Sequence, residues 1–457
     1  MVNVPRTLRL APALAALLLA GCATVDPSAT LATQREELES RGLAGIEWRT
    51  TEAARDAAIE RSRALLAEAL TPAAAVEVAL LRSPALQAEL AGLGVAQAEL
   101  AQATRLANPG LSFSRLSGGG EDETTTGIAA DIVDWLTQPL RRRLGEAELE
   151  RAKLEIGAAV LDLATASRVA LVELQAAEAL VARLVTIEQI DRAAADYAQA
   201  LRAAGNLTAG ELAQAEAGWG ETKGELLLAR AEANRRREAV IRALGLSGVE
   251  TWSAAPLAAP PTAVAEAELA ALEETAAGDR LELAAARWAV EALERARTLR
   301  RRTRWLPVGL EAGFERERDG DLTRRGPTVE LALPIFDTGA ASLARYGAEI
   351  ERARAQAAGV EAAVRSEVRE KASDLAAAVE LAALYRDVVL PRRLEALDAT
   401  LRDYNQMLVG TFDVLIAKQE EIDAEKRAIE ATAAAWVARF ELDRALGRLT
   451  GTPEGGR

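Results

Sequence analysis

Residues 331–342, LALPIFDTGAAS, change their hydrophobic period partway along the stretch. In the preceding residues and up to position 335, apolar side chains occupy every second position, at Val329, Leu331, Leu333 and Ile335. A period of two is typical of a strand with one apolar face. After Asp337 the period becomes helical and stays so for roughly 65 residues, whereas an average helix has about 12. The stretch therefore predicts a strand that leads directly into a helix too long for an ordinary globular domain.

The composition limits the classes of function. Half of the 457 residues are hydrophobic but only 4% are aromatic, so the core must rely on small side chains and close backbone approach. The formal net charge of −14 argues against nucleic-acid binding, which needs a basic surface. The chain contains no His, which excludes His-dependent catalytic triads and His-ligated metal sites. We therefore expect neither a cofactor nor a resident metal ion.

The N-terminus has the features of a secretory signal. Arg6 and Arg9 precede the apolar stretch LAPALAALLLA, which is too short to anchor the chain as a stable membrane helix. The following letters, LAGC, resemble a bacterial lipobox and predict removal of residues 1–21 and lipidation of Cys22. Ala23 follows, rather than Asp, which favours the outer membrane as the destination. The alternative is an ordinary signal peptide that happens to be followed by Cys.

An internal repeat predicts the architecture. A helix runs into a strand at Pro109 in the first half of the chain and at Pro307 in the second half. Each of these strands is followed by a polar loop, a second strand, a very long helix, a short Gly-containing turn and another long helix. The expected strands are at about 107–116, 127–136, 306–317 and 327–336, with polar loops at 117–126 and 318–326. The expected tip turns between the long helices are at about 203–210 and 409–414.

The same pattern predicts the domain organisation. After the signal peptide we expect an N-terminal linker at 22–70 and a first repeat at 71–245. A Pro- and Ala-rich junction at 246–278 leads to the second repeat at 279–450, and a short tail occupies 451–457.

The long helices carry a heptad-like apolar stripe. In the second repeat its members step by three and four: Leu343, Tyr346, Ile350, Ala353, Ala357, Val360 and Val364. Sustained over this length, the stripe predicts antiparallel coiled-coil hairpins. Pro391 interrupts the second repeat's helical pattern and has no counterpart in the first repeat. Because Pro bends or breaks a helix, the two hairpins should not be equivalent.

The strands alternate between apolar and polar or small residues. Val308, Leu310, Ala312 and Phe314 interleave with two glycines and two glutamates. This alternation suits a membrane barrel, but a half-buried hairpin of a soluble sheet shows the same pattern. After the signal peptide, no segment approaches the roughly 20 apolar residues of a membrane helix. If the mature chain crosses a membrane, it must do so with strands.

Together, these features resemble the TolC-like outer-membrane efflux protein family over about residues 70–450. The resemblance rests on the lipobox, the duplicated unit, the strand starts ANPGLSF and WLPVGLEAGF, and the motifs LPIFDTGA and DYNQMLVGTFDVLIAKQE. The lipobox favours the lipoprotein branch, which serves metal-type or drug-type exporters. The resemblance implies a homotrimer in which each chain gives four strands to one twelve-stranded barrel and two helical hairpins to a periplasmic tunnel. Four strands alone cannot close a barrel, so oligomerisation also follows from their unpaired edges.

The resemblance also implies candidate site residues. The turns around Gly205 and Gly410 correspond to periplasmic tips that gate the tunnel and meet an adaptor, although each Gly also fits a simple helix C-cap. The candidates for inter-chain links that close the entrance are Asp403, Tyr404, Asp413 and Lys418. The candidates for an acidic lumen lining are Glu420, Glu421 and Asp423. Taken alone, each charged residue is more typical of ordinary solvated surface.

The leading hypothesis for function is a passive exit duct of a tripartite exporter. Its expected partners are two further copies of the chain, a periplasmic adaptor, an inner-membrane pump of the RND type and outer-membrane lipids. The alternatives are an adaptor-like protein and a purely structural coiled-coil lipoprotein. Adaptors carry one hairpin rather than two, and a structural coiled coil would not need alternating strands. An enzyme is not expected, and the sequence does not distinguish metal ions from drugs as cargo.

Overall fold

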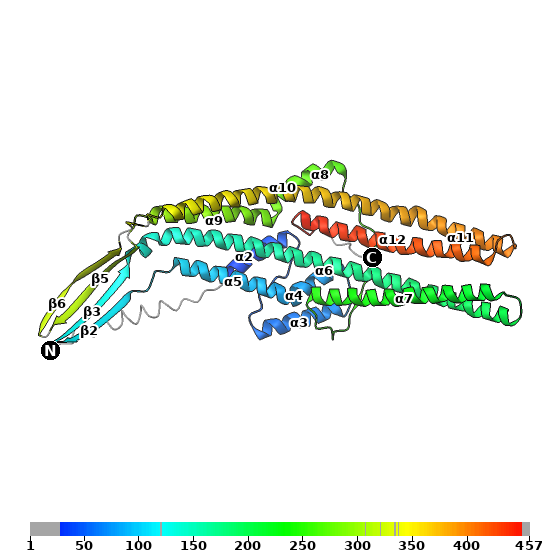
Figure 1. Ribbon diagram of the computed structural model, residues 1–457, viewed down its shortest axis with the longest axis horizontal. Coiled ribbons are helices and arrows are strands. Elements are labelled where there is room, and N and C mark those ends of the chain that lie inside the picture. The colour runs from blue at the N-terminus through cyan, green and yellow to red at the C-terminus, as the bar shows by residue number, and fades with distance from the viewer. Residues whose placement is uncertain are drawn as a thin grey trace. The chain divides into compact units, whose positions relative to one another are not determined.

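The computed structural model describes residues 28–118, 121–306, 308–319, 321–332, 335–336 and 338–449 (Figure 1). The predicted signal peptide, Cys22, Pro307, Pro334, Asp337 and the C-terminal tail lie outside these residues. The chain divides into two compact units. The first, here called the sheet unit, comprises Met1–Gln34, Gly92–Lys153 and Trp288–Ala353. The second, here called the helical unit, comprises Arg35–Ala91, Leu154–Arg287 and Arg354–Arg457.

The element order repeats the predicted unit. The first copy consists of α4 (Pro72–Arg82), α5 (Pro84–Thr104), β2 (Gly110–Gly118), β3 (Glu121–Asp131), α6 (Ile132–Ala203) and α7 (Ala209–Leu244). The second consists of α8 (Leu269–Asp279), α9 (Leu281–Thr303), β5 (Val308–Asp319), β6 (Leu322–Ala332), α10 (Ala340–Leu384), the π-helical turn η3 (Tyr385–Val389), α11 (Leu390–Asn405) and α12 (Thr411–Ala445). The predicted fold class, mainly helical with two strand pairs and two long hairpins per chain, is confirmed.

The stretches expected to be connectors contain further elements. The N-terminal stretch forms α2 (Ser28–Ser40), α3 (Glu52–Leu66) and β1 (Ala69–Leu70). The junction contains β4 (Ser253–Ala254), the 3-10 turn η2 (Glu266–Glu268) and most of α8. Their Pro and Ala content suggested irregular chain, but buried apolar side chains such as Leu38 and Trp252 hold these stretches in the fold.

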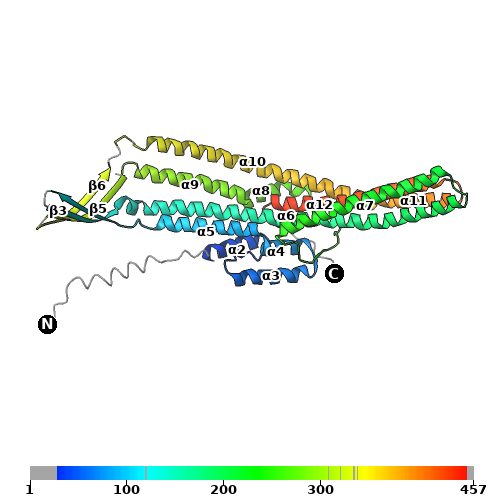
Figure 2. The same cartoon turned by 60° about the horizontal axis from the view of Figure 1, so that its bottom comes forward.

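The sheet unit contains one antiparallel four-stranded sheet in the order β2-β3-β5-β6. The strands lie side by side in both views (Figures 1 and 2). The central pairing of β3 with β5 joins the two repeats, with Ile128 opposite Phe314. Within the described part of the chain, β2 and β6 each pair on one side only and are therefore the edges of the sheet.

The strand ends differ from those expected. The strand predicted at 127–136 ends at Asp131, because the Asp131 carboxylate accepts hydrogen bonds from the N–H groups of Val133 (2.8 Å) and Asp134 (3.1 Å) and so starts α6. The stretches predicted as polar loops are also largely paired as strands. Thr125 lies opposite Ser114, and Glu317 lies opposite Arg324. Threonine is β-branched and favours strands, so the polar composition of these stretches was misleading.

The repeat extends to details of the backbone in the helical unit. The short helices α4 and α8 end at residues of nearly the same conformation, Ser83 (φ −61°, ψ 118°) and Arg280 (φ −65°, ψ 118°). Gly245 and Gly447, which follow α7 and α12, both have positive φ. A Cβ atom on Gly245 would lie 2.8 Å from the Arg82 carbonyl oxygen, and one on Gly447 would lie 3.0 Å from that of Asp279. Each returning helix thus ends against the short helix of its own repeat.

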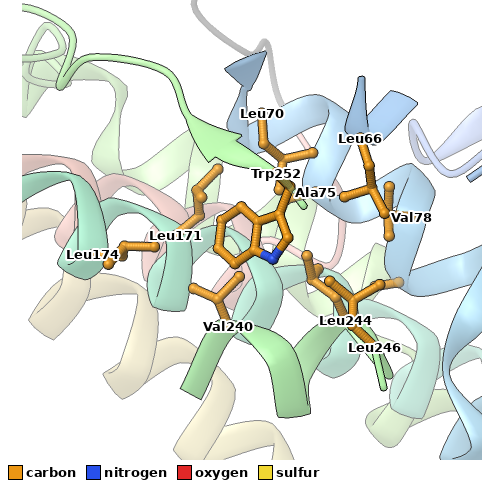
Figure 3. Close-up of a cluster of buried hydrophobic side chains, with 11 residues drawn as sticks. Leu66, Leu70, Ala75, Val78, Leu171, Leu174, Val240, Leu244, Leu246 and Trp252 are labelled. Carbon is orange, nitrogen blue, oxygen red and sulfur yellow. The ribbon is translucent and has the colours of Figure 1, made fainter. Parts of the chain in front are cut away.

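Each repeat has its own apolar core within the helical unit. The first core lies among α3, α4, α6 and α7 and includes Trp252 (Figure 3). Its buried members are Leu66, Leu70, Ala75, Val78, Ala79, Leu171, Leu174, Val240, Leu244, Leu246 and Trp252. The equivalent core among α8, α10 and α12 comprises Ala276, Val364, Val368, Leu375, Ala438, Leu442, Ala445 and Leu446. The many Ala residues permit the close helix approach that the composition predicted.

Pro391 makes the two long hairpins unequal, as predicted. Pro391 has no N–H to donate and its ring disturbs the preceding turn. The chain accommodates it with η3, in which the N–H of Leu390 bonds to the carbonyl of Tyr385, five residues earlier. In the first repeat, α6 is a single helix of 72 residues.

Glu250 provides a test of the loop that closes the first core. Its carboxylate accepts hydrogen bonds from the Ser247 hydroxyl (2.7 Å) and from Arg82 (2.7 Å). These bonds, that from Ser247 first, lower the pKa of Glu250 to about 2. We expect Glu250→Gln to reduce the free energy of unfolding by about 1.5 to 2 kcal/mol at neutral pH, because it removes charge-assisted bonds.

The pH dependence of this effect follows from the pKa. The folded-state pKa is depressed, so the carboxylate stabilises the fold fully above the ordinary value of 4.5 and loses its effect as pH falls through about 2. Chemical unfolding of both proteins from pH 7 to pH 3 measures the difference, and the exposed Glu36→Gln serves as control. A difference that stays constant down to pH 3 would contradict the prediction.

Candidate functional site

The first hairpin turns between α6 and α7 by a Schellman motif. The N–H of Asn206 bonds to the carbonyl of Leu201 (2.9 Å), and that of Gly205 bonds to the carbonyl of Arg202 (3.0 Å). Gly205 has φ +78°, a conformation that a residue without Cβ adopts at little cost. Thr208 and Glu211 then form a capping box at the start of α7. The predicted tip at Gly205 is therefore a compact turn held by hydrogen bonds within its own hairpin.

The second hairpin uses the same motif with a different corner residue. The N–H of Leu408 bonds to the carbonyl of Asp403 (2.9 Å), and that of Met407 bonds to the carbonyl of Tyr404 (2.9 Å). The left-handed position is Met407, at φ 60°, and not Gly410. Gly410 instead precedes α12 with φ −90°, so the C-cap interpretation is wrong for this residue. The sequence pointed to the Gly, but the main chain reverses three residues earlier.

Asp413 and Tyr404 lie at this second tip. The Asp413 carboxylate accepts a hydrogen bond from the Gly410 N–H (2.8 Å) and so caps α12 of its own chain. Tyr404 is 42% exposed, and Met407 beside it is 93% exposed. The roles of Asp403, Tyr404 and Asp413 in closing an entrance stay predictions.

A charged network joins the two hairpins within the helical unit. Arg183 of α6 donates to Glu421 of α12 (2.9 Å) and forms an ion pair with Glu425. Lys418 donates to the other carboxylate oxygen of Glu421 (2.6 Å). Glu421 is only 2% exposed, so in the single chain its side chain faces the first hairpin. This network, here called the hairpin lock, pairs two predicted site residues with Arg183, which the sequence did not single out.

The surroundings of the hairpin lock are partly dehydrated. Burial raises the pKa of Glu425, and it also raises that of Asp191 of α6, whose carboxylate accepts a hydrogen bond from the Thr222 hydroxyl (2.6 Å). Lys418 opposes both shifts through its positive charge. Loss of any one cation here would therefore leave buried carboxylates poorly compensated.

The other predicted acidic residues lie on the solvated side of α12. Glu420 pairs with Arg393 of α11, and Asp423 lies 3.8 Å from the Lys426 ammonium. Both carboxylates are about half exposed, at 47% and 50% of the side chain. Their assignment to a lumen stays a prediction, as does lipidation of Cys22, which lies outside the described residues.

The four-stranded sheet has two chemically different faces. Residues directly opposite each other in an antiparallel pair share a face. One face, here called the apolar face, carries side chains that are each at least 51% exposed: Leu111, Phe113, Ile128, Phe314 and Val329. The other, here called the acidic face, carries small residues together with Glu123, Asp131, Glu311, Glu315, Glu317, Asp319 and Glu330.

Within the described ranges, no helix combines the length and the apolarity needed to cross a membrane. The same residues include no group of three or more His, Cys, Asp or Glu side chains arranged to hold a metal ion.

Comparison with known proteins identifies the fold. No protein-family model and no curated protein sequence matches the chain. Among solved structures, the outer membrane protein VceC from Vibrio cholerae is 20% identical and matches with a TM-score of 0.65 over 82% of this chain and 95% of VceC. The outer-membrane channel OprN is 16% identical, with a TM-score of 0.67 over 90% of this chain and 95% of OprN. The Campylobacter jejuni outer membrane channel CmeC is 14% identical, with a TM-score of 0.65 over 89% of this chain and 91% of CmeC. The chain therefore has the fold of these outer-membrane channels, the fold that its resemblance to the TolC-like outer-membrane efflux proteins implies.

Proposed function

We propose that the chain is the outer-membrane exit duct of a tripartite efflux system. The observation that carries this proposal is the two-faced sheet, in which both repeats combine their strands and which leads directly into two long helical hairpins. The apolar face suits contact with lipid, and the acidic, Gly-containing face suits a water-filled lumen. Solved channels with the same fold support the outer membrane as the location.

The edges of the sheet support a homotrimer. Among the described residues, β2 and β6 each leave one edge unpaired, which is unfavourable in lipid because backbone groups there find no water. Pairing the β2 edge of one copy with the β6 edge of the next would close twelve strands from three copies into one barrel. The lipid on Cys22 would add an anchor for each copy.

The duct would work with partners that supply energy and selectivity. A periplasmic adaptor and an inner-membrane pump, of the RND type in this proposal, would deliver small molecules or metal ions to it. The helical tips around Gly205 and Met407 would meet the adaptor. The half-exposed carboxylates Glu420 and Asp423 would favour cations near the entrance, whereas Glu421 is buried and paired within the hairpin lock. The cargo would pass without chemical change.

The hairpin lock gives the first test of this function. In planar bilayers we expect the purified protein to be a trimer of low conductance, because in this proposal the hairpin tips close the entrance. Arg183→Ala removes the link from α6 to Glu421 and should raise single-channel conductance at least several-fold. The matched control is Arg402→Ala, since Arg402 pairs with Asp398 of its own helix and forms no ion pair with a second element of the described chain.

The outcomes separate the channel from its alternatives. If the Arg183→Ala and Arg402→Ala variants both form conducting trimers of equal conductance, the hairpin lock does not control the entrance. The proposed channel function would still stand. If both variants are monomers without conductance, the proposed channel function is wrong, and a structural or adaptor-like coiled-coil lipoprotein is favoured.

A further inference from the structure

The apolar face of the sheet becomes basic toward the strand turns. Four arginines follow the apolar side chains along the strands on this same face: Arg115, Arg316, Arg318 and Arg325. Arg316 and Arg325 lie directly opposite each other on β5 and β6, and both are exposed. Like charges in this position destabilise a strand pair. The sheet therefore holds two guanidinium groups together without an evident structural benefit.

Nearby arginines show how such charges are usually compensated. Arg324, the neighbour of Arg325 on the acidic face, pairs with Glu317 (3.4 Å). Arg115 pairs with Asp122 (2.6 Å). Across the part of the chain that the structure describes, neither Arg316 nor Arg325 has a carboxylate partner within ion-pair distance. An anion from outside the chain would supply the missing charge.

The height of these arginines on the sheet indicates where that anion lies. Arg316, opposite Arg325, follows Val308 by eight residues, which spans about 26 Å along the strand, or about 20 Å along the membrane normal at a tilt of about 40°. The apolar band of a membrane barrel is about 25 Å tall, and the remaining distance of about 5 Å is one that a long arginine side chain spans when it extends to the interface. At the helical end of the sheet unit, Trp135 and Trp305 are 56% and 61% exposed, as in an aromatic belt at the opposite interface. The arginines would thus reach the headgroups of the outer leaflet.

We propose that Arg316 and Arg325 bind the phosphate of a lipid headgroup in the outer leaflet of the outer membrane. The inference rests on the proposed channel function, which places the apolar face against lipid. A guanidinium group presents a planar fork of N–H donors that matches phosphate oxygens, and two opposed forks can hold one phosphate between them. The bound phosphate turns the repulsion between the two arginines into a clamp between β5 and β6.

The test measures binding of lipid A to the full-length protein in a mild detergent. Native mass spectrometry counts the lipid molecules retained as bisphosphorylated lipid A is titrated, with dephosphorylated lipid A as the comparison. We expect Arg316→Gln/Arg325→Gln to weaken binding of the bisphosphorylated form by about tenfold or more. Arg324→Gln, a neutralisation on the same strand but on the acidic face, should leave binding unchanged.

A second measurement separates binding from folding. In lipid-free detergent the Arg316→Gln/Arg325→Gln variant should unfold at the same temperature as the wild type or a higher one, because it loses like-charge repulsion. Added lipid A should raise the unfolding temperature of the wild type but not that of this variant. A variant that is less stable without lipid would overturn the uncompensated pair on which the inference depends.

Three further results would overturn the proposal. They are unchanged lipid binding by the Arg316→Gln/Arg325→Gln variant, equal retention of dephosphorylated lipid A, and full displacement of lipid A by inorganic phosphate, which would assign the site to a free anion. If they occur in a conducting trimer, only the lipid site fails. If the protein is a monomer that does not conduct, the proposed function fails with it.

Discussion

Asp443→Ala is expected to lower the free energy of unfolding by about 3 to 5 kcal/mol, because it leaves a buried arginine without its carboxylate partner. Arg168 of α6 and Asp443 of α12 are 1% and 0% exposed, and they form an ion pair at 3.2 Å in the helical unit. Burial lowers the pKa of Arg168, and the charge of Asp443 opposes that shift. The Arg168 guanidinium also lies 3.8 Å from the centre of the Phe440 ring, which completes its enclosure.

The pair matters because it connects the two repeats. The contact between Arg168 and Asp443 joins α6 to α12. Two small apolar clusters also join these helices, one through Val172 and Phe440 and the other through Leu184 and Ile422. Arg439 also reaches Asp443 (3.2 Å), so removal of the carboxylate would leave two cations close together. The cost of the substitution should therefore lie toward the upper part of the expected range.

Chemical unfolding monitored by circular dichroism measures the effect. The matched control is Asp423→Ala, an exposed carboxylate on the same helix, which should change stability by less than about 0.5 kcal/mol. The double variant Arg168→Leu/Asp443→Leu removes both charges and should recover most of the loss. Equal destabilisation by Asp443→Ala and by the double variant would refute the explanation, since it would make packing rather than charge responsible.

The sequence predicted the architecture because both the strand period and the helix period of hydrophobic residues are visible in it. The change of period near residue 335 located a strand followed by a long helix, and the matching strand starts at Pro109 and Pro307 showed that the unit is used twice. Helix and strand periods depend on near neighbours in the chain, so a single sequence displays them. Pro391 likewise predicted the inequality of the hairpins, which η3 explains.

The parts that were missed depend on distant residues. Arg168 and Asp443 are 275 positions apart, and Arg183 and Glu421 are 238 apart. In the sequence each of these residues is one charge among many on long helices, which usually means solvated surface. No local pattern shows that these particular charges meet inside the fold.

The predicted corner residue of the second tip and the predicted strand ends differ from the structure for a local reason. Composition suggested Gly410 as the corner and an acidic, Thr-rich stretch as a loop. The main chain instead places Met407 in the left-handed position, where hydrogen bonds to the last carbonyls of α11 form the turn. It places Thr125 in a strand, because threonine is polar but also β-branched and favours strands.

Phe314→Arg is expected to destabilise insertion of the protein into a bilayer by about 2 to 4 kcal/mol, the cost of a cation facing lipid near the membrane centre. Phe314 lies on the apolar face in a row with Leu111, Ile128 and Pro327, one residue from each strand. It is 51% exposed in the single chain, although a large aromatic side chain gains nothing from water. Contact with lipid tails would account for that exposure.

Glu315→Arg introduces the same side chain one position later and serves as the matched control. Because successive strand residues point to opposite faces, this arginine would project from the acidic face, next to Glu317 along the strand. It should insert as readily as the wild type. Its effect should appear in ion selectivity, since a cation among lumen carboxylates weakens their attraction for other cations.

Two measurements test which face of the sheet contacts lipid and which lines the lumen. Urea-dependent refolding into lipid vesicles should show a loss for Phe314→Arg and none for Glu315→Arg. The reversal potential in a salt gradient should report a cation-selective pore in the wild type and weaker cation selectivity in Glu315→Arg. If both variants insert equally well, the apolar face does not meet lipid. If Glu315→Arg blocks insertion while Phe314→Arg does not, the two faces have been assigned the wrong way round, and the arginines of the apolar face would line the lumen instead.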